Sequence, residues 1–218
     1  RARTVDRFVQ DIPLTLNGMD YMQEANHYLM DYGVVIPLVN DYHIIRWLQE
    51  EVEGTPVIME GRSLASEYRY NSRISINTGL PTVLGWNWHQ RQQRTLDPLS
   101  RIVQQRESNV KYFYESDDIT SVANMIRYYD IEYIIVSDME IAMYLEGIQK
   151  FNRMVELELL SIVYQHGVGL VYQVDHDTVD NFLMDQAVFN EAIGLDESVL
   201  PSYVPMTAIV GHSPDDTV

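Results

Sequence analysis

The stretch DITSVANMIRYYDIEYIIVSD, residues 118–138, indicates the fold class of this chain. Its first half repeats apolar residues at intervals of three and four, which predicts an amphipathic helix that Asp117 or Asp118 caps. The apolar stripe consists of Ile119, Val122, Ile126 and Tyr129. Residues 133–136 then form a short apolar run, which is typical of a buried strand. A helix that leads directly into a buried strand indicates an α/β domain.

The neighbouring segments continue this alternation. Residues 111–114 favour a strand before the helix, and Asp138 caps another helix after the second strand. Successive strand–helix units predict an α/β fold with a mostly parallel sheet and flanking helices. Residues 161–164 and 169–174, joined by a turn that contains Gly167, predict a C-terminal antiparallel β-hairpin at the edge of that sheet.

The N-terminal half gives a second helix–strand unit. Asn40 or Asp41 caps a helix, and residues 57–59 form a short buried strand after it. The apolar stripe of this helix consists of Ile44, Ile45, Leu48 and Val52. Residues 73–76 alternate apolar and polar side chains and favour a further strand, and residues 96–106 favour a helix.

The charge of the chain is unevenly distributed. The formal net charge is −17, but residues 62–106 contain seven Arg against Glu67 and Asp97 and therefore carry +5. A strongly acidic chain repels nucleic acid over most of its surface, so we expect no nucleic-acid partner. Arg binds carboxylate and phosphate in a planar, bidentate geometry, which favours anion recognition by this basic segment. The alternative explanation of the Arg content is genome composition together with internal salt bridges.

The segment GWNWHQRQQR, residues 85–94, is the most unusual part of the basic region. Trp faces and guanidinium groups suit a sugar ring next to a phosphate or a carboxylate. The candidate substrate-binding residues are Arg62, Arg73, Trp86, Trp88, His89, Arg91 and Arg94. A loop that holds itself to the domain through buried Trp side chains is the structural alternative.

Carboxylates also follow the predicted strands, at the sheet edge where ligands of α/β proteins bind. Helix capping is the favoured interpretation of Asp117, Asp118 and Asp138, while Glu60 is the least explained of these carboxylates. The chain has no Cys, no glycine-rich nucleotide motif, no nucleophile-elbow Ser and no paired-His metal motif. We therefore predict no catalytic residue, metal or cofactor within this chain.

Four segments together resemble the soluble part of the YYY-type membrane proteins of bacteria and archaea. They are DYHIIRWL at 41–48, GTPVIME at 54–60, YNSRIS at 70–75 and TGLPTVLGWNWH at 78–89. The resemblance covers about residues 15–175, and its most specific part is the block at 79–94. YYY-type proteins span the membrane several times and are related in architecture to the C-type glycosyltransferases.

The resemblance implies a place and a role for the chain. In C-type glycosyltransferases the membrane part binds a lipid-linked sugar donor and an early extracytoplasmic loop holds the catalytic carboxylate, which this chain would lack. The chain would be an extracytoplasmic domain that binds acceptor or lipid phosphate next to the membrane-spanning part of the same polypeptide. Residues 1–40 would lead in from a preceding membrane region, 41–175 would form the α/β domain, and 176–218 a helical appendage and tail.

Two other functions remain open. The chain could be a structural or interaction module that binds a protein partner through its Arg- and Trp-rich block at 85–94, because Trp and Arg are typical of interface centres. A free-standing enzyme that uses Glu60 with His89 ranks last, because no nucleophile or cofactor motif supports it. The chain begins at Arg1 and not at Met, which favours a fragment of a longer protein.

Overall fold

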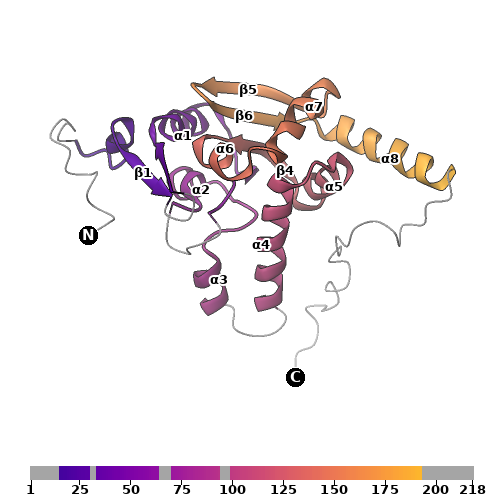
Figure 1. Ribbon diagram of the computed structural model, residues 1–218, viewed down its shortest axis with the longest axis horizontal. Coiled ribbons are helices and arrows are strands. Elements are labelled where there is room, and N and C mark those ends of the chain that lie inside the picture. The colour runs from indigo at the N-terminus through magenta and orange to yellow at the C-terminus, as the bar shows by residue number, and fades with distance from the viewer. Residues whose placement is uncertain (1–14, 30–32, 64–69, 94–98, 193–218) are drawn as a thin grey trace.

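The computed structural model describes residues 15–29, 33–63, 70–93 and 99–192 and has an α/β fold with two sheets (Figure 1). The main sheet has the strand order β3–β4–β6–β5, and the small sheet pairs β1 with β2. The strands are β1 (Asn26–Leu29), β2 (Val34–Pro37), β3 (Val57–Met59), β4 (Ile131–Val136), β5 (Leu160–His166) and β6 (Gly169–Val174). The helices are α1 (Val39–Glu51), α2 (Arg73–Thr78), α3 (Asn87–Gln93), α4 (Leu99–Glu115), α5 (Ile119–Tyr129), α6 (Asp138–Tyr144), α7 (Lys150–Glu156) and α8 (His176–Ala192).

The main sheet is mixed, so the prediction of a mostly parallel sheet is wrong. Strands β3 and β4 are parallel, with Ile58 opposite Tyr133, but β4–β6 and β6–β5 are antiparallel pairs. The predicted C-terminal hairpin is confirmed as β5–β6, and its second strand pairs with β4. Among the described residues, the sheet therefore contains a single parallel pair.

The predicted strand at 111–114 is wrong, because these residues form the end of α4. Val103, Val110, Phe113 and Tyr114 are all buried, and their spacing fits one face of a helix. The aromatic residues at 112–114 favour a strand when they are considered alone. The apolar stripe that begins at Val103 extends the helix through them, beyond the predicted end at residue 106.

The predicted strand at 73–76 is also wrong, because these residues belong to α2. Helix α2 follows Ser72, which has a left-handed backbone with a φ of 55°, and ends at Gly79, which has a φ of 80°. A helix this short is not stable alone. Its first backbone N–H groups are bound by a carboxylate from another part of the chain, described below, and local sequence does not reveal that contact.

The predicted helix ends differ in detail from those observed. Asp118 caps α5 as predicted, since its side chain accepts a hydrogen bond of 3.1 Å from the Ser121 backbone N–H. Ser137, and not Asp138, precedes α6, and Leu38 precedes α1, so Asn40 and Asp41 lie inside that helix. Asp138 and Asp41 are therefore available for contacts other than helix capping.

The two faces of the main sheet are covered by different helices (Figure 1). Ile58, Ile135 and Val171 face the layer that contains α1 and α2. Their neighbours on the strands point the other way, into the larger core formed with α4, α5, α7 and α8. The alternation along each strand explains why the two inner strands, β4 and β6, are buried on both faces.

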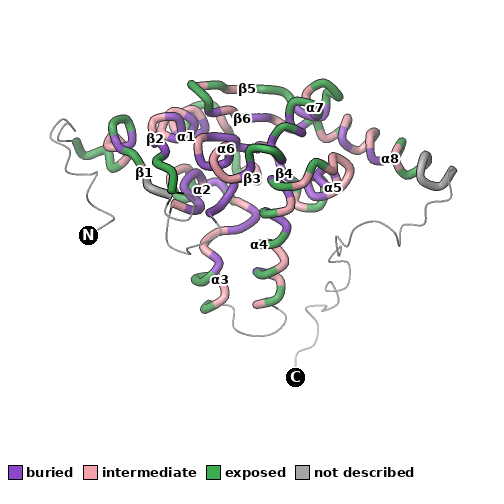
Figure 2. The backbone as a smooth tube through the Cα atoms, viewed as in Figure 1, coloured by how far each residue is buried: buried purple, intermediate pink, exposed green. Residues whose placement is uncertain are grey.

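Helices α3 and α4 lie side by side and extend away from the sheet (Figure 1). Their far ends are partly or fully exposed, whereas the part of α4 near the sheet is buried (Figure 2). In the described part of the chain, none of the helices is both long enough and apolar enough to cross a bilayer. Helix α3 therefore starts at the domain, where Asn87 is buried, and its later residues lie farther from the sheet (Figure 1).

Candidate functional site

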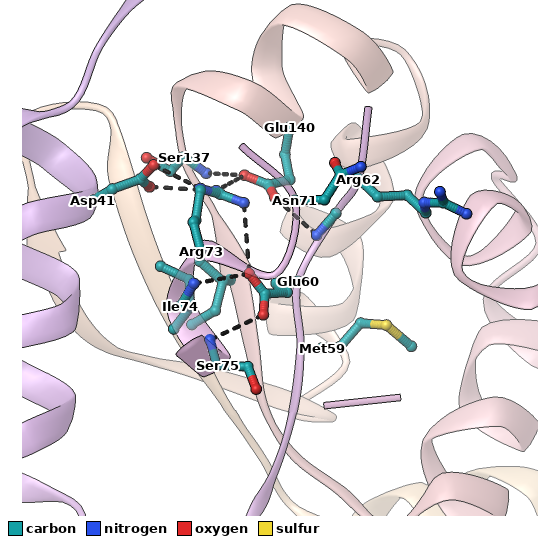
Figure 3. A network of polar contacts seen from close by, with 12 residues as sticks. Asp41, Met59, Glu60, Arg62, Asn71, Arg73, Ile74, Ser75, Ser137 and Glu140 are labelled. Carbon is teal, nitrogen blue, oxygen red and sulfur yellow. Dashed lines mark hydrogen bonds and ion pairs between the residues drawn. The ribbon is translucent and has the colours of Figure 1, made fainter. Parts of the chain in front are cut away.

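Glu60 follows β3 directly, and its carboxylate binds the start of α2 (Figure 3). Oε2 accepts a hydrogen bond of 2.9 Å from the Ile74 backbone N–H, and Oε1 accepts one of 3.0 Å from the Ser75 backbone N–H. A helix N-terminus has free N–H groups and a partial positive charge, so it stabilises a carboxylate at this place. This contact joins the end of β3 to α2 and accounts for the otherwise unexplained Glu60.

Arg73 lies at the centre of the same buried group (Figure 3). Its Nε donates to Asp41 Oδ2 at 2.6 Å, and its Nη2 donates to Glu140 Oε2 at 2.7 Å and to Asp41 Oδ1 at 3.3 Å. Its Nη1 lies 3.8 Å from Glu60 Oε2. We call Asp41, Glu60, Arg73 and Glu140 the buried charge cluster. It joins α1, the end of β3, α2 and α6.

Glu140 connects the buried charge cluster to the ends of both parallel strands. Its Oε1 accepts a hydrogen bond of 2.8 Å from the Gly61 backbone N–H, and its Oε2 accepts one of 3.0 Å from the Ser137 backbone N–H. A Cβ at Gly61 would lie 2.7 Å from Glu140 Oε1, so only glycine fits this close approach. The carboxylate therefore fixes the chain at both strand ends.

Burial has the largest effect on the pKa values of Glu60 and Glu140. All four side chains belong to residues that are at most 3% exposed. Burial raises the pKa of Glu60 to about 7, although Arg73 and the two backbone N–H groups oppose the shift. Burial also raises the pKa of Glu140, with Arg73 again opposing. For Arg73, burial opposes the charged form, but Asp41, Glu140 and Glu60 raise its pKa above the ordinary value.

Arg62 is also buried, and its guanidinium points away from Arg73 (Figure 3). It forms an ion pair with Glu107 of α4, and Glu107 also accepts a hydrogen bond from the side-chain amide of Asn87. The Arg62 carbonyl accepts a hydrogen bond of 2.6 Å from the Tyr144 hydroxyl. Two of the seven predicted binding residues, Arg62 and Arg73, are thus inside the domain and paired with carboxylates of this chain.

Trp86 attaches the start of α3 to the domain. Its Nε1–H donates a hydrogen bond of 3.1 Å to the Asn71 carbonyl, one residue before Ser72. The Asn71 side chain in turn accepts a hydrogen bond of 2.7 Å from the Ser63 backbone N–H. The indole is partly buried, so Trp86 fits the structural alternative of a Trp that holds its own loop.

The remaining predicted residues of the block lie on the surface of α3. Trp88 is 49% exposed, and the Arg91 guanidinium carbon lies 5.8 Å from the centre of its ring. His89 is exposed and makes an edge contact with Trp86, with ring centres 5.6 Å apart. Arg94 lies outside the described residues. The structure therefore brings together Trp88, His89 and Arg91 on one exposed helix, apart from Arg62 and Arg73.

Asp41 and Glu140, the partners of Arg73, were not among the residues predicted for the site. The pattern Ser137-Asp138-Met139-Glu140 matches a capping box and is the signal from which Glu140 could be recognised. Asp41 lies inside α1 and gives no comparable signal. Glu60 is buried against α2 and His89 is exposed on α3, so the geometry does not favour the enzyme hypothesis that pairs these two residues.

A second polar group lies beside the start of α6. Asn40 Nδ2 donates to Asp138 Oδ2 at 2.7 Å, and Asn40 Oδ1 lies 3.1 Å from His166 Nδ1. The rings of His43 and His166 are stacked with centres 3.7 Å apart. Within the described ranges, no three His, Asp or Glu side chains are placed to hold a metal ion. The hydrogen bonds and the ring contact connect α1 to the start of α6 and to the end of β5.

Comparison with known proteins found no match to this chain. No family model matched the chain, and neither did any curated protein or solved structure.

Proposed function

We propose that this chain is an extracytoplasmic domain of a membrane glycosyltransferase-like protein, and that it contributes recognition without catalysing the transfer itself. In this proposal, the exposed side of α3 binds the phosphate of a lipid-linked sugar or a glycan acceptor. The domain works next to the membrane-spanning part of the same polypeptide, at the outer side of the plasma membrane. The observation that carries the proposal is the exposed Trp88 with the Arg91 guanidinium over its ring.

Several features of the α3–α4 pair support this role. It extends from the sheet (Figure 1). Leu99 at the start of α4 is 41% exposed. Arg101 is also exposed, on the same part of α4. Trp, Leu and Arg together are typical of surfaces that contact lipid head groups, because the ring and the aliphatic chain bind apolar surface while the guanidinium binds phosphate. A basic, aromatic helix surface on a chain of net charge −17 is therefore suited to one local anionic contact.

Because Arg62 and Arg73 are buried, the proposed binding surface contains fewer residues than the sequence predicted. Each guanidinium forms ion pairs with carboxylates of this chain inside the domain. In this proposal both therefore hold parts of the domain together and do not contact the ligand. The proposed contact residues are therefore Trp88, His89 and Arg91, with Arg94 as a further basic residue in the sequence. Trp86 holds α3 in place through Asn71.

The test is cosedimentation of the purified chain with neutral phosphatidylcholine vesicles that contain, or lack, a polyprenyl phosphate. We expect binding only with the phosphate lipid, and a weaker affinity for Trp88→Ala and for Arg91→Ala. The loss should be roughly tenfold or more for Arg91→Ala, since a charge-assisted contact contributes on the order of 1.5–3 kcal/mol. Tyr128→Ala and Arg153→Ala change an exposed aromatic residue and an exposed Arg elsewhere and should bind normally. Equal binding by all four folded variants would reject the proposal.

The alternative function is an interaction module that uses the same surface to bind a protein. An exposed Trp next to Arg is also the typical composition of an interface centre. In that case the phosphate lipid would have no effect, and Trp88→Ala would weaken binding to the membrane-spanning protein in detergent. The two functions therefore differ in whether a polyprenyl phosphate alone is sufficient for binding.

A further inference from the structure

The buried charge cluster has an imbalance that the recognition role does not explain. Asp41, Glu60 and Glu140 present three carboxylates to the single guanidinium of Arg73, and all four groups are withdrawn from water. If all three carboxylates were ionised, the cluster would carry two uncompensated negative charges in the interior. Buried uncompensated charge is strongly unfavourable, so such a group tends to bind a proton.

We propose that the cluster is a proton-binding site in which Glu60 takes up and releases a proton, and that its state is transmitted through α2 to the Trp86 indole at the start of α3. The inference is independent of the proposed lipid-phosphate contact, because it concerns the interior of the domain.

Glu60 is the member of the cluster that is least compensated by Arg73. Asp41 and Glu140 each accept a direct hydrogen bond from the guanidinium, at 2.6 and 2.7 Å, whereas Glu60 lies 3.8 Å from the nearest guanidinium nitrogen. The other polar groups on Glu60 are the backbone N–H groups of Ile74 and Ser75. Protonation of Glu60 therefore weakens fewer direct contacts with Arg73 than protonation of Asp41 or Glu140 would.

The elements packed around Glu60 contribute few further charges. Helix α1 contributes Asp41, α2 contributes Arg73, α6 contributes Glu140, and α4 contributes the buried Tyr114 hydroxyl, which is bonded to the Met59 and Ile135 carbonyls. Glu140 raises the pKa of Glu60, and Arg73 lowers it. Burial is the larger effect, and the resulting pKa of about 7 allows the proton to exchange near neutral pH.

Hydrogen bonds at both ends of a short stretch of backbone, residues 71–75, connect Glu60 to Trp86. The carboxylate binds the first turn of α2, which follows directly on Asn71 and Ser72. The Asn71 carbonyl accepts the hydrogen bond of the Trp86 indole, and the Asn71 side chain is bonded to Ser63. Loss of the proton strengthens the charge that acts on the first turn of α2. We therefore expect the indole N–H of Trp86 to report the ionisation of Glu60.

The experiment measures the indole N–H signals of the three Trp residues by NMR from about pH 5 to about pH 9. Because the His89 ring contacts Trp86, both proteins that are compared carry His89→Gln, and they differ only at position 60: His89→Gln alone and the double variant His89→Gln, Glu60→Gln. The Trp86 signal should shift with a midpoint near pH 7 in the first protein and remain constant in the second.

A second measurement requires no variant at position 60. The side-chain carboxyl carbon of Glu60, assigned through the backbone in the unsubstituted chain, should titrate near pH 7 and not near the ordinary value of 4.5. A titration of this carbon near pH 4.5 would overturn the proposal. So would a Trp86 signal that shifts equally in both His89→Gln backgrounds, or one that does not shift in either.

Discussion

Arg73 donates a hydrogen bond of 2.6 Å to Asp41 across 32 positions of the chain, and both side chains are buried. The contact joins α2 to α1 and places a guanidinium where three carboxylates meet. A buried ion pair adds little over an apolar pair, but the loss of one partner leaves the others uncompensated. The stability of the domain should therefore depend strongly on Arg73.

Arg73→Met should lower the free energy of unfolding by about 3–5 kcal/mol, because it leaves buried carboxylates without their cation. Urea unfolding followed by circular dichroism measures the change. Arg153→Met is the matched control on the exposed side of α7 and should change stability by less than about 0.5 kcal/mol. Similar stability in both variants would mean that Arg73 does not hold the cluster together.

Tyr114→Phe should cost about 1–3 kcal/mol. The hydroxyl lies 2.9 Å from the Met59 carbonyl and 2.8 Å from the Ile135 carbonyl, and the residue is fully buried. Its loss leaves these strand carbonyls without this donor, while the ring volume is kept. Tyr112→Phe changes a half-buried Tyr on the same helix and should unfold at nearly the same urea concentration as the original chain.

Lys150→Met should remove a pH dependence of stability. Burial lowers the pKa of Lys150 from 10.5 to about 7, against the opposing effect of Asp117. Between these values the unfolded chain binds more protons than the folded one. Stability should therefore rise with pH from about 7 to 10.5, by up to about 1.4 kcal/mol per pH unit, and be lost as the pH falls.

Urea unfolding at several pH values measures the effect of Lys150. Lys111→Met is the control, because Lys111 is 46% exposed and pairs with Glu115 at the surface. The pH dependence should persist in this control and be weaker in Lys150→Met. A rise in stability of the same size in both variants would assign the effect to other groups.

Gly147→Ala should destabilise the domain by about 1–3 kcal/mol or more. A Cβ at Gly147 would overlap the backbone carbonyl oxygens of Tyr114 and Glu115, which cannot move aside without shifting the end of α4. Gly18→Ala adds the same methyl group where no atom lies within 4 Å. Thermal unfolding should separate the two variants clearly, and a small effect of Gly147→Ala would contradict the close packing at the end of α4.

Local sequence patterns were sufficient to predict the elements whose own residues show a clear apolar spacing or turn. Helix α5 and the hairpin β5–β6 follow from the spacing of apolar residues and from a turn with glycine. The same reasoning failed for 73–76, since α2 is stabilised by the distant Glu60. It failed for 111–114 because the three adjacent aromatic residues at 112–114 favour a strand when considered alone. The helical stripe to which they belong begins at Val103, eight positions before residue 111.

The amino-acid sequence by itself determined the α/β class, the acidic charge and the concentration of Trp and Arg at 85–94. Only the tertiary structure decided which Arg residues remain available for a ligand. Composition assigns the same potential to Arg73 and Arg91, but Arg73 is buried among Asp41, Glu60 and Glu140, and Arg91 lies over an exposed Trp ring. The physical reason is that a guanidinium's role depends on its desolvation and its partners, and folding brings those partners from distant parts of the chain.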